Sequence, residues 1–153
     1  MWWLLLLLIP LSWAALVLPS WRRPSLGLVE GKLRRCPDSP NCVCSEGATG
    51  EHAIDPFSYA TKPSHAAAWS DLKVVLQSSE GARIITQNDE YMHVEFTTPL
   101  MRYVDDVEFR KTPEAIHVRS ASRVGRSDLG ANRKRMERLR QAYQPTISMD
   151  QQS

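Results

Sequence analysis

Apolar and polar residues alternate with a period of two along much of the second half of the chain, which is the pattern of half-buried strands. The turn signals Asn88-Asp89 and Thr112-Pro113 divide this region. The predicted strands are residues 82–87, 91–98, 103–111 and 114–120. Because each run follows the previous one after a short turn, we expect neighbouring strands to pair antiparallel.

Helical periodicity flanks these strands on both sides. Pro63 or Ser64 marks the start of a first helix, since proline suits a first helical turn, and Gly81 marks its end. A second helix is predicted for residues 132–143, where apolar residues recur at helical spacing. This order of elements predicts an α+β fold, a small antiparallel sheet of about four strands with helices on one face.

The chain begins with a segment that carries no charged side chain between residues 2 and 18. Such a segment, if helical, is roughly 25 Å long, which is near the lower limit for a membrane span. Tryptophans near both ends, at positions 2, 3 and 21, suit the headgroup region of a bilayer. We predict that residues 1–21 form an N-terminal membrane helix. The alternative is a signal peptide cleaved after Ser12-Trp13-Ala14.

The remaining chain divides by composition. Residues 22–35 combine basic side chains with proline and glycine, and are predicted to be a basic linker near the membrane surface. Residues 36–143 are predicted to form a single α+β domain, in which residues 36–62 are an irregular arm, and residues 144–153 a disordered tail. The basic linker favours the cytoplasm, whereas the cysteines favour an oxidising compartment. We expect the body to be extracytoplasmic.

Three cysteines lie close together, at positions 36, 42 and 44. Pairing Cys36 with Cys42 closes a short, proline-containing loop, a constraint worth roughly 2 kcal/mol. A structural disulfide between these two is our prediction, although three pairings are possible and one thiol remains. The alternative is a zinc site formed by the three cysteines and His52, but the C-x-C spacing is not that of a common zinc site.

The formal net charge is only +2, so the chain has no overall field that would attract nucleic acid. Cations are instead concentrated in the last third of the chain. Residues 120–130 combine serines and glycines, which leave the backbone accessible, with Arg123 and Arg126 just before a helix. Backbone amides at a helix start together with guanidinium groups form an anion-binding site. This loop is therefore the predicted ligand site.

Carboxylates on the third predicted strand complete this site. Alternation places Asp105 on the apolar, core-facing side, where it needs a partner such as Arg119, Arg123 or the loop amides. Asp106 falls on the opposite face, together with Glu108, and this face is expected to be solvated and crossed by ion pairs. The predicted ligand-binding residues are Ser120, Ser122, Arg123, Arg126, Asp105 and Asp106.

Three blocks of this sequence resemble the family of domain of unknown function 1499. The residues that carry the resemblance are Cys36-Pro37, Ser39-Pro40-Asn41-Cys42-Val43, Ser45, Trp69, Val104-Asp105-Asp106-Val107-Glu108-Phe109, Arg119-Ser120-Ala121-Ser122-Arg123-Val124-Gly125, Asp128-Leu129-Gly130 and Asn132-Arg133. The similarity spans roughly residues 33–143, with Cys44 where the family has a serine. The resemblance implies a small envelope-associated or organellar domain, often behind a membrane or export segment. It implies no catalytic residue and no established activity.

These observations predict a membrane-anchored envelope domain that binds an anionic small molecule, a lipid headgroup or a partner's carboxylate. We expect it not to be an enzyme and to need no metal or cofactor, and the sequence names no protein partner. One alternative is a hydrolase that uses Asp106, Glu108 and His117. The other is a purely structural envelope protein.

Overall fold

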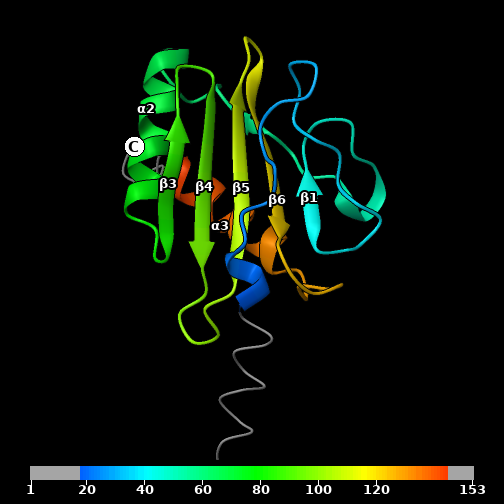
Figure 1. Cartoon of the computed structure of the whole chain (residues 1–153). Coiled ribbons are helices and arrows are strands. Elements are labelled where there is room, and N and C mark those ends of the chain that lie inside the picture. Colours follow the sequence, from blue (N-terminus) through cyan, green and yellow to red (C-terminus); the bar gives the residue numbers. More distant parts are fainter. Residues whose placement is uncertain (1–17, 145–153) are drawn as a thin grey trace, which may run out of the picture.

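The computed structural model describes residues 18–144. They form one antiparallel sheet with two helices packed on one of its faces (Figure 1). The strands follow the order β1-β6-β5-β4-β3, and β2 pairs with another part of β6. The elements are a 3-10 turn at Leu18–Trp21, β1 at Cys42–Cys44, a 3-10 turn at Gly50–His52, β2 at Phe57–Ser58, α2 at His65–Gln77, β3 at Ala82–Gln87, β4 at Tyr91–Thr97, β5 at Val104–Lys111, β6 at Ala115–Ser122 and α3 at Ala131–Tyr143.

The hydrophobic core lies between the helices and the sheet. Leu72 and Leu76 of α2 and Met136 of α3 are fully buried, and they pack on the same side of the sheet as Phe109 of β5. The ring of Phe57 lies edge-on to the ring of Phe109, with the two centroids 5.8 Å apart. Burial of this apolar surface is what holds both helices on one face.

The predicted α+β class and the antiparallel pairing are confirmed, but the sheet has six strands rather than about four. The two additional strands, β1 and β2, come from the arm that was expected to be irregular. Both pair with the outer edge of β6. Strands of three and two residues are too short to show a period of two. They form because the unpaired backbone N–H and C=O groups along the edge of β6 bind them.

The predicted membrane helix lies mostly in residues 1–17, outside the described part of the chain. Its described part, Leu18–Trp21, is a single 3-10 turn. Within residues 18–144, we find no helix with both the length and the apolar content needed to cross a bilayer. The predicted disordered tail likewise lies outside the described residues, except for Gln144.

The predicted disulfide between Cys36 and Cys42 is confirmed, and it excludes these two residues as zinc ligands. His52, the other residue of the zinc alternative, has its Nδ1 2.9 Å from the carbonyl oxygen of Cys42. Cys44 is a free thiol that is only 1% exposed, and burial raises its pKa above the ordinary value. A buried thiol with a raised pKa reacts slowly.

Thiol counting with a chromogenic disulfide reagent should therefore give a stepwise result. We expect no rapid reaction in the native protein, one reactive thiol in urea without reductant, and three after reduction in urea. Two or more reactive thiols in urea without reductant would contradict the bridge between Cys36 and Cys42.

Candidate functional site

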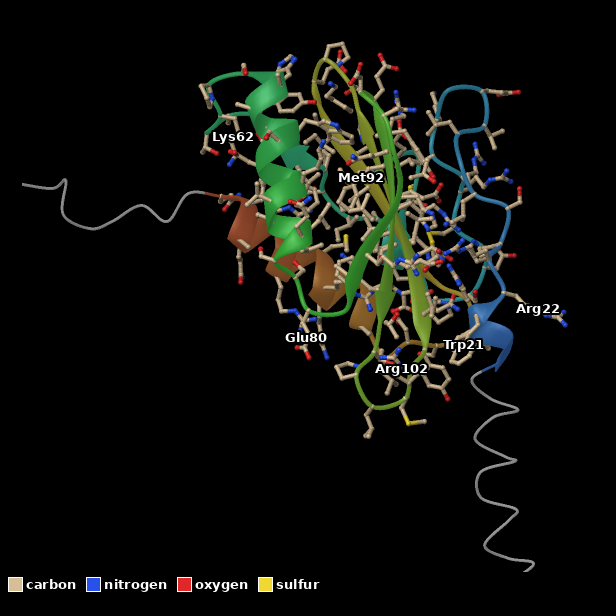
Figure 2. All side chains as sticks on the ribbon, turned by 60° about the vertical axis from the view of Figure 1, so that its left-hand side comes forward. Trp21, Arg22, Lys62, Glu80, Met92 and Arg102 are labelled. Carbon is tan, nitrogen blue, oxygen red and sulfur yellow. A yellow bond between two sulfur atoms is a disulfide. The ribbon has the colours of Figure 1, made fainter. Side chains whose placement is uncertain are left out.

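The segment between residues 22 and 35, predicted to be a linker, lies across the sheet face that the helices leave open. Figure 2 shows Trp21 and Arg22 on the side of the sheet opposite α2. Arg23 Nε donates to Glu95 Oε1 at 2.7 Å, and the backbone N–H of Gly27 donates to Glu108 Oε1 at 2.8 Å. Further along, the side chain of Leu33 is buried. The segment is therefore bound to the domain by specific contacts along its length.

Arg123 is the centre of the charges that this segment covers. Its Nε and Nη2 donate to the two carboxylate oxygens of Asp106 at 2.7 and 2.6 Å. Nη2 also donates to Glu95 at 2.6 Å, and Nη1 donates to the carbonyl oxygen of Ser20 at 3.1 Å. His93 Nε2 lies 2.8 Å from Asp106 Oδ1. Since each nitrogen of the guanidinium group has a partner and the side chain is only 3% exposed, Arg123 is not accessible to a ligand from solvent.

The pKa values in this network shift toward full ionisation. Burial alone would raise the pKa of Asp106, but hydrogen bonds from Arg123 and His93 outweigh burial and hold the pKa below its ordinary value. The pKa of Glu95 is lowered in the same way, by Arg23 and Arg123 against burial. Burial would lower the pKa of Arg123, but its two acidic partners raise it. These side chains are ions at neutral pH, bound to one another.

Glu108 holds the middle of the covering segment. The side chain is fully buried, and besides Gly27 it accepts from the Tyr91 hydroxyl at 2.7 Å and from Arg119 Nη1 at 3.2 Å. Burial and the adjacent Glu108 carboxylate together raise the pKa of Tyr91, so the phenol stays protonated and donates. The prediction that this face is solvated is therefore wrong. The polar side chains are on the predicted face, but residues from the N-terminal segment bury them.

The opposite, helix-facing side carries a second polar cluster around Asn132, which is 1% exposed. Its Oδ1 accepts from the hydroxyl of Ser120 at 2.5 Å. Its Nδ2 donates to the Asn41 carbonyl oxygen and to Ser122 Oγ, both at 3.0 Å, and to Asp128 Oδ2 at 2.8 Å. The amide of Asn132 thus joins the arm before β1, the strand β6 and the start of α3. In the sequence, Asn132 is one of the residues that carry the family resemblance, but its pattern predicted no role for it.

Asp105 faces this side of the sheet, as predicted, but its partner is different from those expected. Arg135 of α3 donates to Asp105 Oδ2 at 2.5 Å, and it also donates to Asn132 Oδ1 at 2.8 Å. Neither Arg119 of β6 nor Arg123, which directly follows that strand, reaches Asp105, because both bind carboxylates on the other face of the sheet.

The six predicted ligand-binding residues therefore do not converge. Asp105, Ser120 and Ser122 lie on the helix side, and Asp106 and Arg123 lie under the N-terminal segment. Arg126 is exposed and forms no hydrogen bond or ion pair with any described residue. The three residues of the hydrolase alternative do not converge either. Asp106 pairs with buried His93, Glu108 is covered, and His117 contacts Ser45 instead.

A cavity of about 800 Å³, which we call the basic pocket, opens between the N-terminal segment and the residues after β1. It is lined by Val29, Glu30, Lys32, Leu33, Arg34, Arg35, Ser45, Glu46, Gly47 and His117. Lys32, Arg34 and Arg35 form no ion pair within residues 18–144. The Nε of Arg34 is buried and has no hydrogen-bond partner among these residues. Sequence reasoning missed this site because it assigned the basic segment to the membrane surface.

The carboxylates of the basic pocket do not cancel these cations. Glu46 is already bound by Arg110, whose Nη2 donates to Glu46 Oε1 at 2.5 Å, and by the backbone N–H of Leu33 at 2.8 Å. Burial alone would raise the pKa of Glu46, but these hydrogen bonds lower it. Glu30 is the other acid of the lining, and it is exposed. The pocket therefore has more positive than negative charge available to a ligand.

A serine and a histidine form the polar wall of the same pocket. Ser45 Oγ accepts from the backbone N–H of Val118 at 2.8 Å and lies 3.2 Å from His117 Nδ1. Within the described residues, no carboxylate contacts His117 Nε2. The pair thus lacks the third group that orients the base in a catalytic triad. Its geometry suits a polar contact to a ligand.

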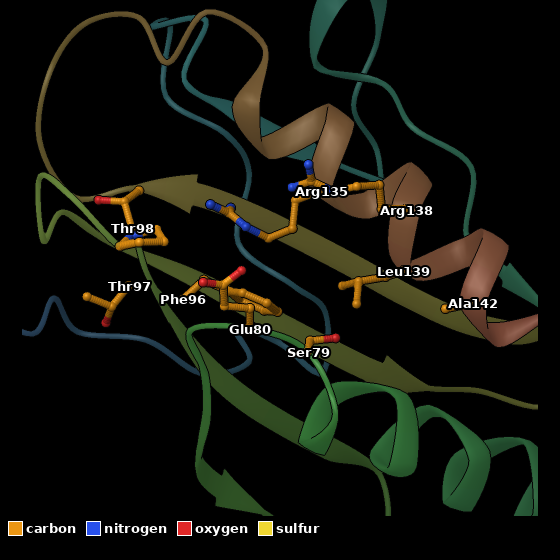
Figure 3. Close-up of a pocket in the computed structure, with 10 residues that line it drawn as sticks. Ser79, Glu80, Phe96, Thr97, Thr98, Arg135, Arg138, Leu139 and Ala142 are labelled. Atoms are coloured by element: carbon orange, nitrogen blue, oxygen red, sulfur yellow. The ribbon is translucent and has the colours of Figure 1, made fainter.

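Another cavity, of about 560 Å³, lies between α3, the end of β4 and the turn before β3 (Figure 3). Arg135 lines it, but the guanidinium group is bound to Asp105 and Asn132 and lies over the ring of Phe96, 5.0 Å from its centroid. The acid Glu80 lines the same space. This cavity offers an anion fewer free donors than the basic pocket does.

A model of the family described as "Protein of unknown function (DUF1499)" matches residues 32–143 of this chain. No curated protein and no solved structure matches the chain. The matched range includes both polar clusters except for Ser20, Arg23 and Gly27, and it includes eight of the ten residues that line the basic pocket.

Proposed function

Because the chain belongs to the DUF1499 family, which is described as being of unknown function, we propose a function from the site itself. We propose that this protein is a membrane-held domain that binds an anionic small molecule, or an anionic lipid headgroup, in the basic pocket. The observation that carries the proposal is the set of three cations on one cavity wall, Lys32, Arg34 and Arg35, none of which forms an ion pair with a described residue.

Three positive charges line the basic pocket without an acidic partner among the described residues. An anion in the basic pocket would meet the charges of Lys32, Arg34 and Arg35 together. Guanidinium groups match phosphate and carboxylate groups with two parallel hydrogen bonds. The volume of about 800 Å³ is in the usual range for small-molecule sites.

The uncharged stretch between residues 2 and 18 supports the proposed attachment to a membrane. The disulfide supports an extracytoplasmic body, since such bonds persist in oxidising compartments. Two features argue against nucleic acid as the ligand: the net charge is small, and no aromatic side chains stand beside the free cations to stack bases.

Calorimetric titration of the full chain with pyrophosphate, at constant ionic strength, tests the proposal. We expect binding that the Arg34→Ala substitution weakens at least about tenfold, because hydrogen bonds to charged groups contribute about 1.5–3 kcal/mol. Arg22→Ala is the matched control, since Arg22 is an exposed arginine of the same segment but does not line the pocket.

Equal affinities for the wild type and the Arg34→Ala variant would remove the basic pocket as the site. Absence of binding to pyrophosphate and to citrate would favour the purely structural alternative.

A further inference from the structure

One end of the sheet presents large apolar side chains that stay mostly exposed. The strand register aligns Ala82, Phe96, Asp105 and Ser122 at this end, so the β4–β5 loop and the β6–α3 loop both leave the sheet here. We call this the membrane-facing end. It comprises Leu18–Trp21, the β4–β5 loop at residues 98–103 and the β6–α3 loop at residues 123–130.

The exposure at this end is unusually high. The side chains of Leu100 and Leu129, one from each loop, are 85% and 87% exposed, and Trp21 is 55% exposed. Leu129 also has a positive φ of 53°, a backbone region that is unfavourable for a residue with a Cβ atom. Neither leucine contributes to the core. Clustered apolar exposure of this kind marks an interaction surface.

The N-terminal segment enters the domain at this same end. Trp21 Nε1 donates to the carbonyl oxygen of Arg102 at 3.3 Å, which ties the turn to the β4–β5 loop. Figure 2 shows Trp21 and Arg102 close together at one end of the molecule. The residues before this turn, 2–18, have no charged side chain. The sequence that could enter a bilayer therefore joins the domain beside the exposed leucines.

The same turn and loops also carry unpaired cations. Arg22, Arg102 and Arg126 are exposed and form no ion pair with any described residue. Asp128, an acid of the β6–α3 loop, is already occupied, because its carboxylate accepts the backbone N–H groups of Gly130 and Asn132. Exposed tryptophan, leucine and arginine together are the composition that suits the interface of an anionic bilayer.

We propose that the membrane-facing end rests in the headgroup layer of a lipid bilayer. Trp21, Leu100 and Leu129 enter the interface, and the three arginines contact anionic lipid. The proposal builds on the membrane attachment in the proposed function and adds a fixed orientation to it. The contacts of Arg23 and Gly27 with the sheet prevent the domain from swinging on a free linker.

This orientation places the basic pocket away from the bilayer. Ser45 follows β1 and His117 lies near the start of β6, whereas the β6–α3 loop leaves the other end of that strand. In Figure 1 the turn at residues 29–32 lies at the opposite end of the molecule from the 3-10 turn at Leu18–Trp21. The ligand of the basic pocket is therefore a molecule of the water phase rather than a headgroup of the supporting membrane.

Site-directed spin labelling of the full chain, reconstituted in vesicles of phosphatidylcholine and phosphatidylglycerol, tests this. The background carries Cys44→Ser, and single labels replace Leu100, Leu129 or, as the matched control, exposed Asp89 in the β3–β4 turn at the other end. We expect the Leu100→Cys and Leu129→Cys labels to be more accessible to oxygen than to a water-soluble nickel chelate. The Asp89→Cys label should show the reverse.

If the protein floats with the vesicles but the nickel chelate reaches all three labels equally, the proposed contact of this end with the bilayer is wrong. The proposed membrane attachment would still stand. Failure to co-float would overturn both. A short distance between Leu100→Cys labels on two copies would assign the surface to self-association and also overturn the proposal.

Discussion

Replacing Arg123 with alanine is expected to lower the free energy of unfolding by about 3–5 kcal/mol, because it leaves buried carboxylates without their cation. Asp106 is 2% exposed and would lose both of its hydrogen bonds to this arginine. Glu95 and the carbonyl oxygen of Ser20 would each lose one. Urea unfolding of the full chain, followed by circular dichroism in the same mild detergent for all variants, measures the change.

Arg126→Ala is the matched control, because it removes a neighbouring arginine that has no partner among the described residues. We expect its effect to stay within about 0.5 kcal/mol, as for most surface substitutions. Similar stabilities of the Arg123→Ala and Arg126→Ala variants would show that the buried ion cluster does not hold the N-terminal segment.

The Asn132→Ala substitution should have an effect of comparable size, a loss of about 2–5 kcal/mol. Each buried polar group left unpaired costs about 1–3 kcal/mol, and this change leaves the buried hydroxyl of Ser120 without its acceptor. The carbonyl oxygen of Asn41 would lose one of its two donors and keep the backbone N–H of Ser122. Arg135 would also lose one of its two acceptors. The same urea titration reports the loss.

Lys134→Ala, two residues further along α3, controls for changes in helix propensity, since Lys134 is exposed. An Asn132→Ala variant as stable as the Lys134→Ala variant would mean that the amide network is not what joins β6, α3 and the arm before β1.

Much of the fold follows from local pattern. The four longer strands and α3 lie within two residues of their predicted bounds, because each element has an apolar face that must be buried. The helix α2 begins within two residues of its predicted start but ends at Gln77, four residues before Gly81. The short strands β1 and β2 could not be predicted, since their hydrogen bonds depend on where β6 passes. Their partners on β6 are about 60–80 residues away along the chain.

The site was only partly predictable for the same reason. Alternation correctly assigned Asp105 and Asp106 to opposite faces of one strand. It could not say which cation meets which carboxylate. Arg135 lies 30 residues from Asp105, and Arg123 lies 103 residues from Ser20. The N-terminal segment binds the sheet partly through backbone N–H groups, such as that of Gly27, which no side-chain pattern reveals.

The arginines thus divide into two classes by their partners. Those of the 119–135 region with buried acidic partners, such as Arg123 and Arg135, hold the fold together. Those of the N-terminal segment without such partners, such as Arg34, line the basic pocket. The distribution of carboxylates, rather than that of cations, therefore indicates where an anion can bind.

The most direct measurement is a titration of the isotope-labelled full chain with pyrophosphate, followed in its amide NMR spectrum. The account predicts that the largest shift changes fall on residues 32–35 and 45–47 and on His117, around the basic pocket. The largest changes at residues 120–130 instead, with the basic pocket silent, would contradict it.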